Sequence, residues 1–346
     1  MEPPSRSTGR WIADALAGSW RRDPPGAPLA ESIWNAIGPP LIRSGAGALA
    51  WRQIRRSPLA GSTIGRRLKE IFRFQRLQTG VYERELERAL GRLRQAGIEP
   101  IVIKGWATAQ AYPERGARPL GDLDLVVHPG LLGAAQSVIH ETGPYAILID
   151  WVHLEIDGLD RRRFEDLYER SSLRPLGSVE VRVLSAEDHL RALCLHLLKH
   201  GAYRPLWLCD IAAALEHRPS KFDWDRCFGN DGKRARWVGS VIRLTHELLG
   251  ARIESIPSQC RWSAPRWLGR EVLRQWDDPA PKNRWTPELF ARAWSRPHRL
   301  PAALRARWWD PIRSTLHLRG AIDARPRFPY QLTSFLLRGT QYLSRR

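Results

Sequence analysis

Cysteine is scarce in this sequence, and long hydrophobic runs are absent. Only four of the 346 residues are cysteine, and their spacing matches no disulfide framework, which favours a reducing compartment. No uncharged apolar stretch is long enough to cross a bilayer, so we predict no transmembrane segment. Near the N-terminus, Asp14 interrupts the apolar stretch and Arg21 and Arg22 follow it, which makes a poor signal peptide. The sequence therefore predicts a cytoplasmic protein.

Lysine and acidic residues are also few compared with arginine. The chain has 55 basic and 36 acidic residues, a formal charge of +19, and only six of the basic residues are lysine. So strong a bias toward arginine can follow from codon composition, and the charge alone is therefore a weak indication of nucleic-acid binding. With 43% hydrophobic residues the chain can bury a sizeable core, and its length suggests about two domains.

Several motifs of well-known enzyme classes are missing. The sequence contains no G-x-S-x-G, no Walker A loop and no G-x-G-x-x-G. Their absence argues against serine hydrolases of the nucleophile-elbow type, P-loop enzymes and dinucleotide oxidoreductases. Cys194, His196, His200 and Cys209 suggest a zinc site, but no C-x-x-C or H-E-x-x-H accompanies them. We favour buried cysteines, with the histidines packed near the functional site and Asp210 as their partner.

Hydrophobic periodicity divides the chain into three regions. Apolar residues at three- and four-residue spacing predict a helical N-terminal region, residues 1–97. Short β-branched or alternating segments at 101–103, 122–127, 146–157 and 179–184 predict a β-rich core, residues 98–184. The remainder, residues 185–346, is predicted to be helical, basic and rich in tryptophan and arginine. We therefore expect an α+β fold, with a small mixed sheet of about four or five strands and helices on one side of it.

Two aspartates stand two residues apart at the start of a predicted strand. Asp122 and Asp124 project from one face, about 7 Å apart along the chain. Paired carboxylates at this distance repel each other and are suited to hard cations such as Mg²⁺, which prefer oxygen ligands. A third carboxylate from a neighbouring strand would complete a two-metal site. Taken alone, D-x-D is also common in solvated turns.

The surroundings of this motif make it more specific. Ile101-Val-Ile-Lys-Gly105, Tyr112-Pro113 and the segment Arg118-Pro-Leu-Gly-Asp-Leu-Asp-Leu-Val-Val127 occur in that order, followed by a histidine-containing helical stretch at 193–210. Together, residues 98–215 resemble the uncharacterised nucleotidyltransferase branch of the DNA polymerase β-like superfamily. The resemblance implies a mixed-sheet nucleotidyltransferase core. It also implies a metal-dependent reaction, in which an acceptor hydroxyl attacks the α-phosphorus of a nucleoside triphosphate (NTP) and pyrophosphate leaves.

The resemblance assigns the metal ligands. Asp122 and Asp124 would hold two Mg²⁺ ions, with Mn²⁺ as the alternative, and a third acid would come from a later strand. Glu155 is our choice, because the family commonly has an acid, an apolar residue and then histidine, and Glu155-Ile156-Asp157 is the best match. Aspartate replaces the expected histidine, so Asp157 and Asp150 remain competitors.

Four more residues are candidate nucleotide-binding groups. Lys104 and Arg118 are positioned by the sequence to pair with phosphate oxygens, and Gly105 and Gly121 to supply permissive backbone beside the site. Most of the superfamily has Gly-Ser or Gly-Gly after the first strand, whereas this chain has Lys104-Gly105. Triphosphate binding is therefore less firmly implied than metal binding.

The sequence leaves the acceptor open. A small molecule, a peptide or protein side chain and a nucleic acid are all compatible with it, as is any oligomeric state. The alternating arginines and tryptophans of the last 96 residues, which carry a net charge of +12, are typical of helical core with a charged surface or of a single-strand binder. The alternative function is therefore a non-catalytic RNA- or polyanion-binding protein on a degenerate nucleotidyltransferase scaffold.

Overall fold

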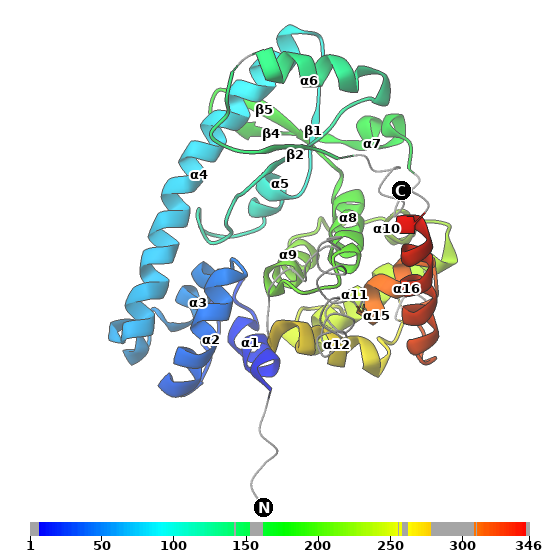
Figure 1. Ribbon diagram of the computed structural model, residues 1–346. Helices are drawn as coiled ribbons and strands as arrows, with labels where there is room; N and C mark the ends of the chain where they lie inside the picture. The colour runs from blue at the N-terminus through cyan, green and yellow to red at the C-terminus, as the bar shows by residue number, and fades with distance from the viewer. Residues whose placement is uncertain are drawn as a thin grey trace, which may run out of the picture.

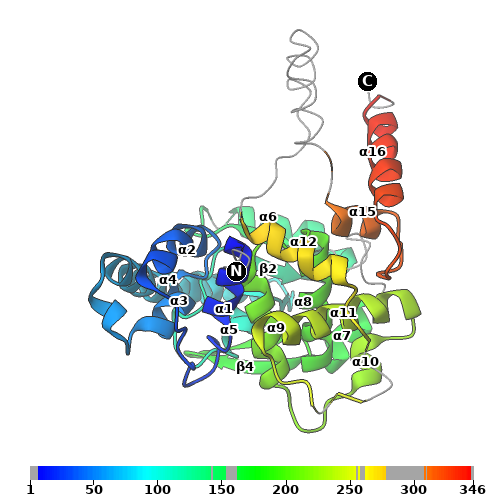
Figure 2. The same cartoon turned by 90° about the horizontal axis from the view of Figure 1, so that it is seen from below.

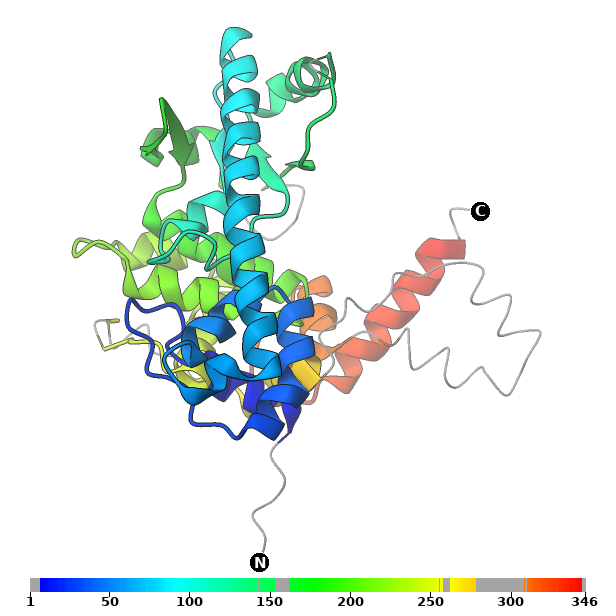
Figure 3. The ribbon, with the colours of Figure 1, turned by 90° about the vertical axis from the view of Figure 1, so that its left-hand side faces the viewer.

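The computed structural model describes residues 7–141, 143–152, 162–254, 256–257, 262–277, 308 and 310–343. A small sheet with its helices lies above a larger helical part, and the long helix α4 (Thr63–Gln95) runs beside both (Figures 1 and 3). The fold is thus mixed α+β, as predicted. No helix among these residues combines the length and apolarity needed to span a bilayer.

The N-terminal region is helical, as the periodicity predicts. It contains α1 (Thr8–Leu16), α2 (Glu31–Arg43), α3 (Gly47–Ile54), the 3-10 turn η1 (Pro58–Gly61) and α4. Helix α4 begins where Ser62 accepts a hydrogen bond from the Gly65 amide at 3.1 Å, an N-cap worth about 1 kcal/mol. Leu68 near its start packs in the helical part, and Leu86 and Leu93 near its end pack against the sheet. Helix α4 therefore joins the two hydrophobic cores.

Five strands form one mixed sheet in the order β3-β2-β1-β5-β4. Their bounds are β1 (Ile101–Val102), β2 (Leu123–Val126), β3 (Ile149–Trp151), β4 (Ser172–Leu176) and β5 (Val179–Val183). Strand β1 is antiparallel to β2 and parallel to β5, and β2 is parallel to β3. Strand β4 was not predicted. It is an edge strand with Pro175 in its interior, a position that proline tolerates only at a sheet edge.

Both faces of the sheet are covered, which corrects the expectation of helices on one side only. One face packs against α4 and α6 (Leu132–Glu141) through residues such as Leu90, Leu125 and Ala135. A smaller cluster on the other face includes Ile103, Val126 and Leu167, the last from α7 (Phe164–Arg170). Short elements α5 (Gly105–Ala109) and η2 (Pro129–Leu131) follow β1 and β2. The strand ends that carry the candidate site are thus rigidly supported.

The rest of the described chain is helical. It contains α8 (Ala186–Lys199), α9 (Pro205–Glu216), α10 (Trp224–Phe228), α11 (Gly232–Leu249), α12 (Arg266–Asp277), α15 (Pro311–His317) and α16 (Phe328–Leu343). Ser185 caps the start of helix α8, because its hydroxyl accepts a hydrogen bond from the Asp188 amide at 3.2 Å. Helices α9, α11 and α12 contact α1 (Figure 2). The division at 97 and 184 stays a prediction, because helices from both ends of the chain share one hydrophobic core.

Several tryptophans of the basic region belong to this core. The Nε1 of Trp237 donates to the Gly320 carbonyl at 2.9 Å, and that of Trp276 donates to the Ala202 carbonyl at 2.9 Å. Trp276 is fully buried. The Arg-Trp pair at 284–285 lies outside the described residues, as do residues 307 and 309. For the described tryptophans named here, the helical-core interpretation holds.

Candidate active site

Three carboxylates meet at the edge formed by β2 and β3. Asp122 precedes β2, Asp124 lies within it, and Asp150 lies within β3. The parallel register sets Asp124 directly beside Asp150. One oxygen from each of the three side chains lies within 4.8 Å of the other two. Asp122 and Asp150 are exposed and Asp124 is buried, so the group is open to solvent on one side and can hold a cation.

Asp124 is ion-paired with Lys104. The Lys104 Nζ lies 2.6 Å from the Asp124 Oδ1, and both side chains are largely buried. Burial raises the pKa of Asp124 to about 6, while Lys104 opposes this shift and the neighbouring Asp122 and Asp150 add to it. Three acids next to one lysine leave a local excess of negative charge. A metal ion would compensate this excess.

The turn after β1 brings Lys104 to this position. Lys104 has a φ of 51°, which is unusual for a residue with a side chain, and Gly105 has a φ of 26°. A Cβ at Gly105 would lie 3.2 Å from the Tyr82 hydroxyl, which donates to the Asp122 carbonyl at 3.0 Å. Glycine is therefore suited to this close approach. Gly121 is exposed and has open space where a Cβ would be, so nothing in the described structure requires glycine there.

Glu155 and Asp157 lie outside the described residues, so their assignment as metal ligands stays a prediction. Asp150, the third candidate, is the one that the described structure brings to Asp122 and Asp124. Alternation along one strand could not identify it, because the choice depends on the register between β2 and β3. That register is set by Leu123 donating to the Leu148 carbonyl and Val152 donating to the Leu125 carbonyl, each at 2.8 Å.

Arg118 is bound by a carboxylate of α9. Its Nε and Nη2 donate to the two oxygens of Asp210 at 2.9 and 3.0 Å, and its Nη1 donates to the Pro119 carbonyl at 2.9 Å. The Tyr112 hydroxyl donates to the same carboxylate at 2.8 Å. All of these side chains are buried. Asp210 therefore pairs with Arg118 and Tyr112 rather than with the histidines, and its pair with Arg118 ties the loop before β2 to the helical part.

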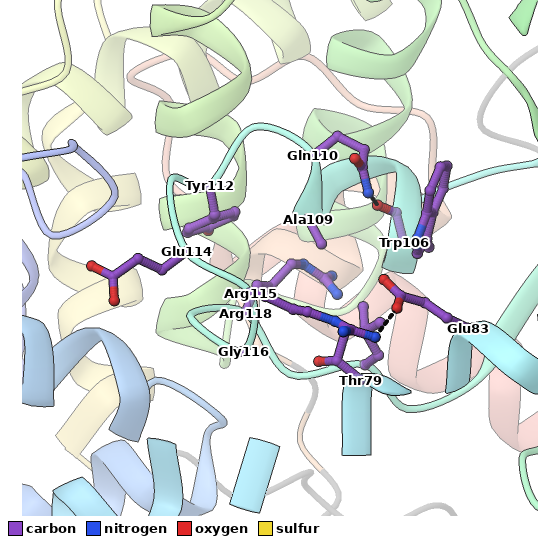
Figure 4. A pocket seen from close by; sticks show the side chains of 11 residues that line it. Thr79, Glu83, Trp106, Ala109, Gln110, Tyr112, Glu114, Arg115, Gly116 and Arg118 are labelled. Atoms are coloured by element: carbon purple, nitrogen blue, oxygen red, sulfur yellow. Dashed lines mark hydrogen bonds and ion pairs between the residues drawn. The ribbon is translucent and has the colours of Figure 1, made fainter. Parts of the chain in front are cut away.

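A cavity of about 250 Å³ lies beside Arg118, between α4 and the loop that follows α5 (Figure 4). Trp106, Gln110 and Arg115 line it from the loop side, and Thr79 and Glu83 line it from α4. Glu83 and Arg115 form an ion pair across its edge. Most of its polar lining groups have partners, since Tyr112 and Arg118 bind Asp210 and Glu114 binds Arg55.

The histidines of α8 pack against Trp207 of α9. The ring centroids of His196 and His200 lie 4.7 and 5.2 Å from that of Trp207, and Tyr203 lies 5.0 Å from it. Burial, the positive charge of Lys104 and the neighbouring His200 lower the pKa of His196 well below its usual value. The histidines are thus packed on the side of the carboxylate site, as expected. Among the described residues, the group that could hold a metal ion is the three aspartates, and Cys194 and Cys209 are buried free thiols.

Comparison with known proteins supports the resemblance. The family model described as "Uncharacterised nucleotidyltransferase" matches residues 32–148 and 149–250. The crystal structure of an antigenic nucleotidyltransferase-like protein from Paracoccidioides brasiliensis is similar at 13% identity, over 54% of this chain and 94% of that chain, with a TM-score of 0.34. A search of curated proteins finds no match. The family match covers more than half of the chain and contains the whole sheet, so the protein belongs to this nucleotidyltransferase family.

Proposed function

We propose that this protein transfers a nucleoside monophosphate from an NTP to an acceptor hydroxyl. The new bond joins the acceptor oxygen to the α-phosphorus, the bond from that phosphorus to the bridging oxygen breaks, pyrophosphate leaves, and the hydroxyl proton is released. The observation that carries the proposal is the group of three aspartates, with oxygens within 4.8 Å of one another, in a chain of this family.

The donor set fits Mg²⁺ or Mn²⁺. Asp122, Asp124 and Asp150 would hold the ions. Glu155, the third ligand that our sequence analysis chooses, and its competitor Asp157 stay alternatives to Asp150. When bound, the metal supplies charge neutralisation on the phosphates and activation of the acceptor oxygen. Asp124 is supported by the sheet on both sides, because β2 pairs with β1 and with β3. A ligand held this rigidly keeps its geometry when the metal enters.

Lys104 would change partner in this reaction. Its ammonium pairs with Asp124. If Asp124 held a cation, the Lys104 side chain would be free to neutralise a phosphate oxygen as a mobile point charge. Gly105 and Gly121 would leave room for the nucleotide beside it. Arg118 already donates to both oxygens of Asp210. It could bind a phosphate as proposed only while keeping these two hydrogen bonds.

The acceptor class stays open among a small alcohol, a peptide or protein side chain and a nucleic acid, and the cytoplasmic location stays a prediction. The alternative, a polyanion-binding protein without catalysis, makes a different prediction about the carboxylates. A scaffold that only binds anions gains nothing from three acids facing one another, because they repel both the anion and each other.

The experiment is incubation with Mg²⁺ and each of the four α-labelled NTPs, with cell extract of the source organism as a supply of acceptors. Transfer gives pyrophosphate and a labelled acceptor, and Asp124→Asn abolishes both. A matched control is Asp23→Asn, which changes an exposed aspartate of the helical part. Retention of nucleic acid without any label transfer, equal in the wild type and Asp124→Asn, would favour the binding protein instead.

A further inference from the structure

Arg204 lies where three segments of the chain meet. Its Nε donates to the Ser44 carbonyl at 2.7 Å, at the end of α2. A Cβ at Gly45 would lie 2.7 Å from the Arg204 Nη2 and 3.2 Å from the Pro119 Cγ. The guanidinium therefore lies beside the loop that leads to Asp122, although Arg204 itself belongs to the start of α9.

An aromatic ring holds the guanidinium in place. Its Cζ lies 5.8 Å from the ring centroid of Trp207, which in turn packs against Tyr203 and His196. The stacked ring and the bond from Nε fix the plane of the group while Nη1 and Nη2 make no further hydrogen bond to the described residues. Arg204 is thus positioned in advance, with the donors of its planar fork available.

This cation has no carboxylate partner among the described residues. Asp210 acts on it electrostatically, but both Asp210 oxygens are taken by Arg118, and one also by Tyr112. Burial and the like charge of Arg118 lower the pKa of Arg204. A partly desolvated charge without a counter-ion is unfavourable, and an arginine in this condition is suited to an anionic ligand.

The carboxylate site is close enough to share such a ligand. Arg204 Nη2 and Pro119 Cγ approach the same position at Gly45, to 2.7 and 3.2 Å, which brings the guanidinium beside the loop three residues before Asp122. Asp122 acts electrostatically on Arg204 and raises its pKa. The three aspartates have an excess of negative charge and suit a metal ion. Arg204 carries a positive charge that no carboxylate of the described residues pairs with. A metal-bound polyphosphate presents anionic oxygens to both.

We propose that Arg204 binds the phosphate tail of the nucleotide, with Trp207 as the ring that orients its guanidinium. This inference rests on the proposed function. This contact would add to the phosphate contact that we propose for Lys104. Two parallel N–H donors match a pair of phosphate oxygens.

The test measures the binding of inorganic tripolyphosphate, which has no base, by calorimetry in the presence of Mn²⁺. The variants are Arg204→Gln and Arg204→Lys in the full chain. Arg218→Gln is the matched control, because Arg218 also donates to a backbone carbonyl and lies over a tryptophan, Trp224, at 5.4 Å. Circular dichroism checks that each variant is folded.

We expect Arg204→Gln to raise the Kd for tripolyphosphate by at least about tenfold, which is the usual effect of losing a hydrogen bond to a charged group. Arg204→Lys keeps the charge but loses the fork, so it should fall between Gln and the wild type, while Arg218→Gln binds normally. The affinity for each NTP should fall as much as that for tripolyphosphate. The corresponding nucleosides should bind to Arg204→Gln and to the wild type with equal affinity.

The two proposals fail in different ways. Tripolyphosphate and NTP affinities that stay within about twofold of the wild type in both Arg204 variants would overturn the role of Arg204 alone. The role of Arg204 would also be overturned if nucleoside binding falls as much as NTP binding, because a structural defect in the variant would weaken both. A wild type that binds neither tripolyphosphate nor any NTP with Mn²⁺ would overturn the proposed function itself.

Discussion

The ammonium of Lys104 lies 2.6 Å from the carboxylate of Asp124, so a side chain occupies the position next to the proposed cation site. Lys104 adopts a φ of 51° to make this contact, and Asp124 is buried beside two further acids. The pair stabilises the site before the metal arrives, and the same contact competes with the metal. Removing Lys104 should therefore lower the stability of the protein but raise its affinity for the metal.

Lys104→Met should lower the stability of the metal-free protein but tighten Mn²⁺ binding. Without Lys104, an ionised Asp124 is left near Asp122 and Asp150, at a cost on the order of 3 kcal/mol. Because the pKa of Asp124 is about 6 even with Lys104 present, the loss should grow as the pH rises above 6 and Asp124 ionises. Urea unfolding in EDTA at pH 5 and pH 8 measures the first effect, and Mn²⁺ titration measures the second. Weaker Mn²⁺ binding in this variant would show that Lys104 does not compete with the ion.

The three candidates for the third ligand can be separated by isosteric amides. Asp150→Asn should reduce transfer by more than about tenfold, or roughly 1.4 kcal/mol, because Asp150 would share the proposed cation with Asp122 and Asp124. Single-turnover kinetics with labelled NTP compare it with Glu155→Gln and Asp157→Asn. If Glu155→Gln is the most damaging and Asp150→Asn is harmless, Glu155 is the ligand and Asp150 only a neighbour.

Arg118 is expected to matter for folding through Asp210. Arg118→Met and Asp210→Leu should each cost about 3–5 kcal/mol, because each leaves a buried polar or charged partner behind. Replacing both, as in Arg118→Met with Asp210→Leu, should cost less than the sum of the single changes. Denaturant unfolding of the four proteins gives the coupling. A stable Arg118→Met variant with a raised KM for NTP would instead assign Arg118 to phosphate binding.

His189 should make stability depend on pH. Its Nε2 lies 3.1 Å from the Thr108 hydroxyl, and burial lowers its pKa to about 4 from the ordinary 6.5. Between these values the unfolded chain takes up a proton that the folded chain does not, so stability falls as the pH drops from 6.5 to 4. His189→Gln should flatten this slope relative to the wild type, whereas His140→Gln, at an exposed position of α6, should not. Equal slopes in all three proteins would mean that His189 is accessible to protons in the folded state.

The local parts of the site could be predicted from the sequence. Alternation predicts that Asp122 and Asp124 share a face, and the turn after β1 brings Lys104 near them. Partners distant in sequence could not be predicted, since Asp210 lies 92 residues from Arg118 and no local pattern joins them. The position of Asp150 depends on the register between β2 and β3, which is a tertiary pairing that no local pattern determines.

Arg204 was missed for the same reason. The chain has 49 arginines, and nothing in the sequence distinguishes Arg204 from the others. Only the fold shows that Arg204 lies beside Pro119 and pairs with no carboxylate of the described residues. Strand β4 was missed because Ser172–Leu176 contains no β-branched residue and includes Pro175, and its pairing with β5 stabilises it instead. Pairings made by tertiary structure are therefore the part that sequence patterns leave undetermined.

The most direct measurement is Mn²⁺ binding, followed by electron paramagnetic resonance, in the presence of a non-hydrolysable α,β-methylene NTP for each of the four bases. It requires no knowledge of the acceptor. We expect saturable binding of the Mn²⁺–nucleotide complex to the wild type and to Asp23→Asn. Its affinity should fall by more than about tenfold in Asp124→Asn and in Asp150→Asn. A wild type that binds no Mn²⁺–nucleotide complex, or an Asp124→Asn variant that binds it as well as the wild type does, would contradict the assignment of this edge of the sheet as the metal and nucleotide site.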